Sequence, residues 1–120
     1  MYSKIVKEYF ENPINLGIIE DADAIGIIKN ESCSDIIKIY IKVDENNIIR
    51  DAKFEVKGCP PVIASCCVVT EMIKEMNIEK AKTLTADEII KKLNGLPKGK
   101  EHCAELVVET LNKAIENISE

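Results

Sequence analysis

The sequence is poor in aromatic side chains and has no excess of basic charge. It contains no Trp, and aromatic residues make up 4% of its 120 residues, so aliphatic side chains must build the core that a 46% hydrophobic content allows. The net charge of −5 argues against a general binder of nucleic acid or anionic membranes, because such surfaces need clustered Lys and Arg. No segment approaches the length of a membrane span.

Signals for export and for subdivision of the chain are also missing. Residues 1–10 contain neither the apolar stretch nor the cleavage site of a secretory signal. The chain shows no internal repeat, low-complexity tract or linker. We therefore expect one domain over residues 1–120, located in the cytoplasm, with no nucleic acid and no membrane among its partners.

Cysteine is the unusual residue that is present. The five cysteines are Cys33, Cys59, Cys66, Cys67 and Cys103. A disulfide framework fits poorly, because the number is odd and an export signal is missing. Free thiols in a small protein of a reducing compartment indicate metal ligation, redox chemistry or catalysis.

Hydrophobic periodicity predicts three strands. Apolar and polar residues alternate over residues 35–43, which is typical of a strand with one buried and one solvated face. A polar turn at residues 44–47 leads into a second strand over 48–56, so these two must pair antiparallel. Residues 22–29 are expected to add another strand.

Helices are predicted on both sides of these strands. The first runs from Ser3 to about residue 12 and the second over residues 62–76. A capping box at residues 85–88 starts a third, and the last spans about residues 100–118. This order predicts the α+β class: a three-stranded antiparallel sheet with helices packed on its single apolar face.

Three of the cysteines lie at the ends of predicted elements. Cys33 precedes the main strand, Cys59 lies between a strand and a helix, and Cys103 is in the first turn of the last helix. Loop ends at the rim of a sheet can converge on a site. The positive N-terminus of a helix is expected to favour the thiolates of Cys59 and Cys103, and Lys100 should help at Cys103. Cys66 and Cys67 are expected to be core residues instead.

Two further candidate ligands adjoin these cysteines. Asp35 faces the same side of an extended chain as Cys33, and His102 directly precedes Cys103. Soft thiolates select iron–sulfur clusters or zinc. The spacing matches neither the zinc-finger nor the ferredoxin pattern, in which cysteine pairs lie two residues apart.

Six short motifs match a known family. They are Tyr2-Ser3-Lys4, Glu11-Asn12-Pro13-Ile14-Asn15-Leu16-Gly17, Cys33-Ser34-Asp35, Asp51-Ala52-Lys53-Phe54, Gly58-Cys59-Pro60-Pro61-Val62-Ile63-Ala64-Ser65 and Lys100-Glu101-His102-Cys103. With these motifs the chain resembles, over almost its whole length, the IscU/NifU N-terminal family of iron–sulfur cluster scaffolds. The resemblance implies an assembly and carrier protein without turnover of its own.

The resemblance also implies roles for individual residues. Cys33, Cys59 and Cys103 match the cluster-ligating cysteines, with [2Fe–2S] as the expected cluster. Asp35 matches the aspartate that keeps the cluster labile, and His102 matches a histidine that ligates metal or lies next to it. Cys103 also occupies the persulfide-acceptor position, and Lys100 matches a lysine of the same loop.

Partners follow from the same resemblance. A cysteine desulfurase supplies sulfur, and apo iron–sulfur proteins receive the cluster. Tyr2 matches a tyrosine linked to persulfide handling and to self-association, which implies a homodimer.

Some positions depart from the family pattern. The loop Leu96-Pro97-Lys98-Gly99-Lys100 replaces the Leu-Pro-Pro-Val-Lys that a DnaK-type chaperone reads, so dependence on that chaperone is not implied. Ser34 replaces a glycine, and Cys66 and Cys67 replace serines. No long insertion separates Cys59 from Cys103, which argues against the zinc-dependent SufU-type branch.

Two alternatives to a scaffold remain. Cys33, Asp35, Cys59, His102 and Cys103 could form a tetrahedral zinc site, and zinc is expected to occupy the same thiolates in purified protein. A cysteine enzyme would use Cys103 as nucleophile and His102 as base. Adjacent helical residues point about 100° apart, which disfavours such a pair.

Overall fold

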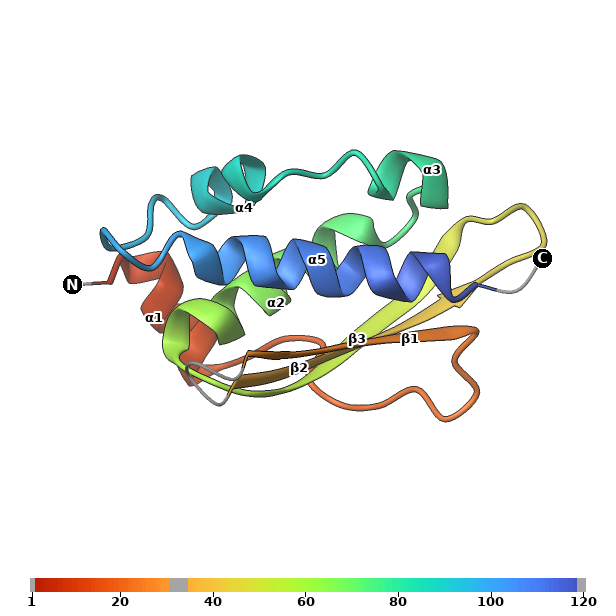
Figure 1. Ribbon diagram of the computed structural model, residues 1–120, viewed down its shortest axis with the longest axis horizontal. Helices are drawn as coiled ribbons and strands as arrows, with labels where there is room; N and C mark the ends of the chain where they lie inside the picture. Colours follow the sequence, from red (N-terminus) through yellow and green to blue (C-terminus); the bar gives the residue numbers. More distant parts are fainter. Residues whose placement is uncertain (1, 31–34, 119–120) are drawn as a thin grey trace.

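The computed structural model describes residues 2–30 and 35–118, in which a three-stranded sheet lies on one side and the helices on the other (Figure 1). The elements are α1 (Lys4–Glu11), β1 (Ala24–Asn30), β2 (Asp35–Val43), β3 (Ile49–Lys57), α2 (Pro60–Ile73), α3 (Ile78–Ala81), α4 (Ala86–Lys92) and α5 (His102–Glu116). The predicted α+β architecture is confirmed.

The sheet has the order β1-β2-β3 and is antiparallel throughout. Ile39 in the central strand lies opposite Gly26 on one side and Phe54 on the other. The alternation read from the sequence holds, because Ile37, Ile39 and Ile41 are all fully buried. The strand predicted over residues 35–43 has those bounds, and the other two are displaced by one or two residues.

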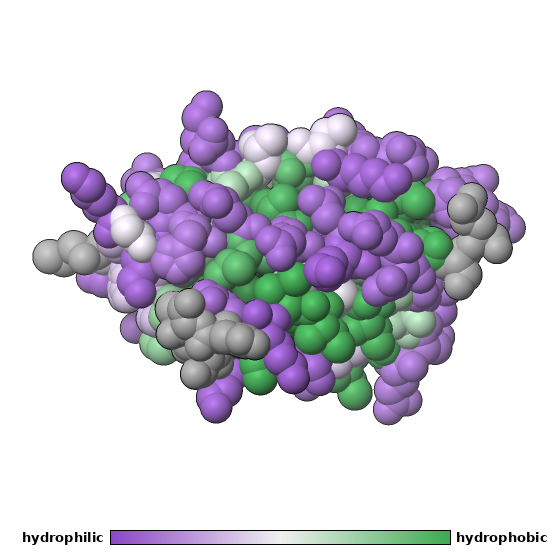
Figure 2. Space-filling model, in the orientation of Figure 1, coloured by the Kyte–Doolittle hydropathy of each residue, from purple (hydrophilic) through white to green (hydrophobic). Residues whose placement is uncertain are grey.

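The two edges of the sheet differ. Along β3, the backbone of Phe54 exchanges hydrogen bonds with Asn15 and Gly17, so the segment after α1 covers that edge. The other edge is β1, where Ile25 and Ile27 point away from the helices and are 40% and 46% exposed. Figure 2 shows hydrophobic surface below the largely hydrophilic outer side of α5.

Helices α2 and α5 cover the inner face of the sheet, α2 over β3 and α5 over β1 and β2 (Figure 1). Helix α5 approaches β1 closely at Gly26, where a Cβ atom would lie 2.5 Å from the backbone nitrogen of Ala114. Glycine is therefore required here for packing: the helix rests on the strand backbone itself.

Helix ends follow the capping signals of the sequence. The Ser3 side chain accepts a hydrogen bond from the backbone N–H of Val6 at the start of α1. Thr85 and Glu88 form the predicted capping box of α4. Helix α3 was not predicted, because its four residues are too few to show a helical period.

Helix α2 is buried around most of its circumference. It packs on α1, α5 and β3, so Cys66 and Cys67 are fully buried as predicted. Burial raises the pKa of Cys66 well above that of a free thiol and that of Cys67 to about 11. Both are neutral core side chains at physiological pH.

None of the described helices is long and apolar enough to cross a membrane.

Candidate metal centre

The start of α2 and the start of α5 meet at the same end of the molecule (Figure 1). Cys59 is the N-cap residue of α2 and Cys103 lies in the first turn of α5. Their Sγ atoms are 4.0 Å apart although 44 residues separate them in sequence. Two thiolates bound tetrahedrally to one metal at about 2.3 Å lie about 3.8 Å from each other, so this spacing suits a shared metal or cluster.

The chain around Cys59 leaves its thiol free. The residue is extended, with φ −83° and ψ 167°, and its side chain makes no capping hydrogen bond. Its carbonyl oxygen instead accepts from the backbone N–H groups of Val62 and Ile63. Pro60 and Pro61 fit the first turn because the N–H groups they lack would have no partner in the helix. The sulfur can therefore face Cys103.

Cys103 is 1% exposed, and its backbone N–H donates to the carbonyl oxygen of Lys100. The exposed ring of His102 turns back over the thiol, with Nε2 3.9 Å from Sγ of Cys103. Their adjacency on the helix was expected to keep these side chains apart. The structure differs, because at the first turn the imidazole can swing toward the neighbouring sulfur.

Asp35 begins β2 and is only 8% exposed. Its carboxylate packs against Gly58, where a Cβ atom would lie 3.3 Å from Oδ1. Glycine before Cys59 thus leaves room for this carboxylate, a role that sequence reasoning missed. The Gly58-Cys59 dipeptide was the available signal, but it does not reveal which side chain fills the space.

The protonation of Cys103 differs from the sequence-based expectation. Burial raises its pKa well above that of a free thiol, and the nearby Cys59 and Asp35 act in the same direction. Lys100 lowers the pKa as expected, but it does not offset burial. The prediction that the helix N-terminus would favour a free thiolate at Cys103 is therefore wrong for the metal-free protein. A bound metal would supply the positive charge that deprotonates the thiol.

The described residues bring together four of the predicted site residues: Asp35, Cys59, His102 and Cys103, with Lys100 close enough to act on Cys103 electrostatically. Cys33 lies outside the described residues. Within residues 2–30 and 35–118, no group of three or more His, Cys, Asp or Glu side chains is placed to hold a metal ion. The described residues thus bring two thiols together without completing a set of metal ligands.

The model of the NifU-like N terminal domain matches residues 1–120. The chain belongs to this family. Among curated NifU-like relatives, the iron–sulfur cluster assembly scaffold protein IscU 1 of Archaeoglobus fulgidus is 46% identical over 115 residues, which cover 96% of this chain and 74% of that protein. IscU of Aquifex aeolicus is 41% identical over 117 residues, which cover 97% and 74%.

Solved structures of the NifU-like fold are also similar. A candidate iron–sulfur cluster assembly scaffold protein for the SUF system of Fervidobacterium islandicum has a TM-score of 0.79 at 27% identity, covering 95% of this chain and 96% of the other. A NifU-like N-terminal domain from Brucella abortus has a TM-score of 0.75 at 19% identity, covering 97% and 92%. The second shows agreement in fold alone.

Proposed function

We propose that this protein is a scaffold on which an iron–sulfur cluster is assembled before it passes to apo-proteins. The observation that carries the proposal is the pair of thiols of Cys59 and Cys103, held 4.0 Å apart beside the carboxylate of Asp35. Relatives at 46% and 41% identity bear the name of scaffold proteins for this assembly. The cluster is the cargo of such a protein.

In this proposal Cys33, Cys59 and Cys103 hold a [2Fe–2S] cluster through three thiolates. Cys33 is included on the sequence motif alone. The fourth ligand is Asp35 or His102, an oxygen or nitrogen donor weaker than a thiolate toward iron–sulfur iron. One iron is then easier to exchange than the other, which combines retention with release.

Sulfur would arrive on Cys103 from the persulfide of a cysteine desulfurase. The Cys103 thiolate attacks the terminal sulfur, a new S–S bond forms, the old one breaks, and the desulfurase thiolate leaves. His102, with Nε2 3.9 Å from Sγ, is placed to take the thiol proton. Reduction of the persulfide to sulfide requires two electrons from an external reductant such as a ferredoxin.

The same proposal covers the setting of the protein. It acts in the cytoplasm, as one domain, with a desulfurase and apo iron–sulfur proteins as partners and without turnover of its own. Tyr2 packs partly buried against the core, where it could support self-association into a homodimer.

Anaerobic reconstitution tests the proposal. The protein is incubated with ferrous iron, cysteine and a cysteine desulfurase while visible absorbance is followed, and an apo-ferredoxin is then added. A scaffold develops sulfur-to-iron charge-transfer bands and loses them as the ferredoxin gains its own. Tight retention of zinc without cluster formation would instead support the zinc protein, which the proximity of His102 to Cys103 also permits.

The Asp35→Ala variant tests the release step. We expect a cluster that survives a chelator several-fold longer and transfers correspondingly more slowly, because the weak ligand is gone. Asp51→Ala, which removes a carboxylate from β3, is the matched control. Gly58→Ala should give an intermediate effect by pushing the Asp35 carboxylate aside. Unchanged transfer in Asp35→Ala would refute the assigned role.

A further inference from the structure

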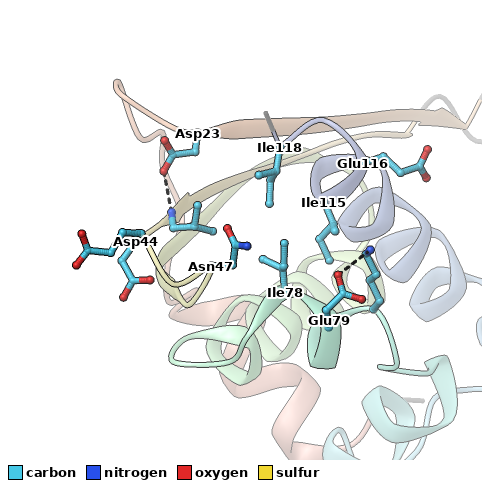
Figure 3. A pocket seen from close by; sticks show the side chains of 11 residues that line it. Asp23, Asp44, Asn47, Ile78, Glu79, Ile115, Glu116 and Ile118 are labelled. Carbon is cyan, nitrogen blue, oxygen red and sulfur yellow. Dashed lines mark hydrogen bonds and ion pairs between the residues drawn. The ribbon is translucent and has the colours of Figure 1, made fainter. Parts of the chain in front are cut away.

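A cavity of about 800 Å³ lies where the β2–β3 turn, α3 and the end of α5 meet (Figure 3). We call it the acidic pocket. It is far from the thiols: Ile115, on its wall, follows Cys103 by twelve residues, or about 18 Å along α5 at 1.5 Å per residue. Of the proposed cluster residues that the structure describes, none lines it.

The floor of the acidic pocket is aliphatic. Ile78 from α3 and Ile115 and Ile118 from the end of the chain point toward the centre of the hollow in Figure 3. Ile78 and Ile115 are 9% and 4% exposed, so they present only small apolar surfaces. Val43 at the end of β2 completes the floor. This floor suits the methylene chain or aliphatic side chain of an inserted group.

The rim of the acidic pocket carries five carboxylates and one lysine. Asp23 and Asp44 accept backbone hydrogen bonds, from Val43 and from Asn46 and Ile48 respectively, which fix their positions. This ordering holds two negative charges at the mouth of the cavity. Arg50, outside the pocket, pairs with Asp44 and offsets part of its charge.

The other carboxylates of the rim are exposed. Glu79 pairs with Lys82, the lysine of the rim, at 3.2 Å. In the part of the chain that the structure describes, Glu45 and Glu116 have no hydrogen bond or ion pair. The negative C-terminal end of the α5 dipole points into the same region and adds to the field.

We infer that the acidic pocket is a docking site for a basic segment of a partner protein, one that inserts an aliphatic side chain between flanking Lys or Arg residues. Charge complementarity selects such a segment, because within the described part of the chain three of the five rim carboxylates remain without a cationic partner after Lys82 pairs with Glu79 and Arg50 with Asp44. The isoleucine floor adds a contact that a purely polar cation cannot use. A cavity of about 800 Å³ is within the range that accommodates bound groups.

This docking site would complement the proposed scaffold function without sharing its residues. A partner held about 18 Å from Cys103 along α5 leaves the thiol end open. Docking and cluster chemistry can then proceed at the same time. The inference does not depend on which metal the thiols hold.

Fluorescence anisotropy with a labelled synthetic peptide tests the inference. The probe is a short segment in which lysines and arginines flank two leucines, and its partner peptide has serines in place of the leucines. We expect the leucine peptide to bind more tightly than the serine peptide, and both to weaken as NaCl rises from about 50 to about 500 mM. Chemical-shift changes in ¹⁵N NMR spectra should centre on the pocket residues.

The variant Glu45→Gln/Glu116→Gln should weaken the leucine peptide about three- to tenfold, as expected for the loss of two partly exposed charge contacts. Glu11→Gln/Glu109→Gln removes the same net charge from exposed sites on α1 and α5 outside the pocket and should leave the affinity unchanged. Circular dichroism checks that both variants fold.

Several outcomes would overturn the inference. Equal weakening in both double variants would show attraction by net charge alone. Equal affinity for the two peptides, or competition by spermine at the same concentration as the leucine peptide, would show a site for any polycation. A dimer by sedimentation that Glu45→Gln/Glu116→Gln dissociates would assign the pocket to a second copy.

Discussion

The two ends of α5 have opposite chemistry. At its start, Cys103 is buried beside Cys59, so that two soft thiols lie together. At its end, Ile115 and Glu116 border a hollow surrounded by carboxylates. We propose that one end holds and releases a metal cluster, whereas the other attracts a cationic segment. In that proposal, a single helix separates the cluster site from the docking site by about its own length, roughly 22 Å for 15 residues.

The local surroundings shift the pKa values at the two ends of α5 in opposite directions. At the thiol end, the removal of water raises the pKa of Cys103 and favours its neutral form in the metal-free protein. At the acidic end, backbone N–H groups hold the pKa of Asp44 below its usual value, with the Ile48 amide as the largest cause. The Cys103 thiol is therefore neutral in the metal-free protein, whereas the Asp44 carboxylate is already charged there.

The largest expected effect comes from a substitution at the start of α5 that should leave the other end of the helix unaffected. Cys103→Ser should abolish the charge-transfer absorbance after reconstitution, because the proposed cluster ligand and sulfur acceptor is lost. The same variant should bind the leucine peptide with unchanged affinity. Glu45→Gln/Glu116→Gln should show the reverse pattern. Loss of peptide binding in a folded Cys103→Ser protein would mean that the ends are coupled.

Between the two ends, α5 rests on Gly26 of β1 at Thr110 and Ala114. Gly26→Ala should lower the free energy of unfolding by about 2–3 kcal/mol or more, because the new Cβ would meet the backbone near Ala114 and cannot be relieved by a side-chain rotation. Urea denaturation measures this loss. Ile25→Ala, at the neighbouring outward-facing position, should cost below about 1 kcal/mol. A small effect at Gly26 would show that α5 can shift on the sheet.

Alkaline pH should destabilise the metal-free protein through the buried thiols of Cys66 and Cys67 in α2. Burial raises the pKa values of Cys66 and Cys67 in the folded protein. Below the pKa of an unfolded thiol, about 8.5, their contribution to the free energy of unfolding is fully present. It falls as pH rises above that value, because the unfolded chain then loses thiol protons that the folded protein keeps. Each thiol contributes a slope of up to about 1.4 kcal/mol per pH unit. Urea midpoints from pH 7 to 10.5 measure it. Cys66→Ala should flatten the slope, and an unchanged slope would contradict the assignment.

Acid pH should destabilise the protein through Asp44 at the acidic pocket, and this is the smallest of the four expected effects. The folded pKa of Asp44 is lowered, so its contribution is present above the unfolded pKa and is lost as pH falls through the folded value. Asp44→Asn should reduce the loss of thermal stability between pH 5 and pH 2, followed by circular dichroism. Asp87→Asn, at an exposed position of α4, provides the comparison. Equal curves for wild type and Asp44→Asn would place the acid sensitivity elsewhere.

Much of the fold could be predicted because its signals are local. The alternation from Asp35 to Val43, the caps at Ser3 and Thr85, and the prolines after Cys59 each depend on neighbours in sequence. Helix α3 escaped prediction because it is too short to show a period. The extent of burial of α2 also escaped, because it depends on elements on several sides.

For the candidate site, the sequence by itself determined which side chains are available and that they stand at the ends of elements. Only the tertiary structure decided that Cys59 and Cys103 lie 4.0 Å apart, that Gly58 leaves space for Asp35, and that burial keeps Cys103 neutral. It likewise gathered carboxylates from four separate segments around one cavity. The physical reason is that periodicity and capping act over a few residues, whereas distance, desolvation and the electric field arise where distant segments pack together.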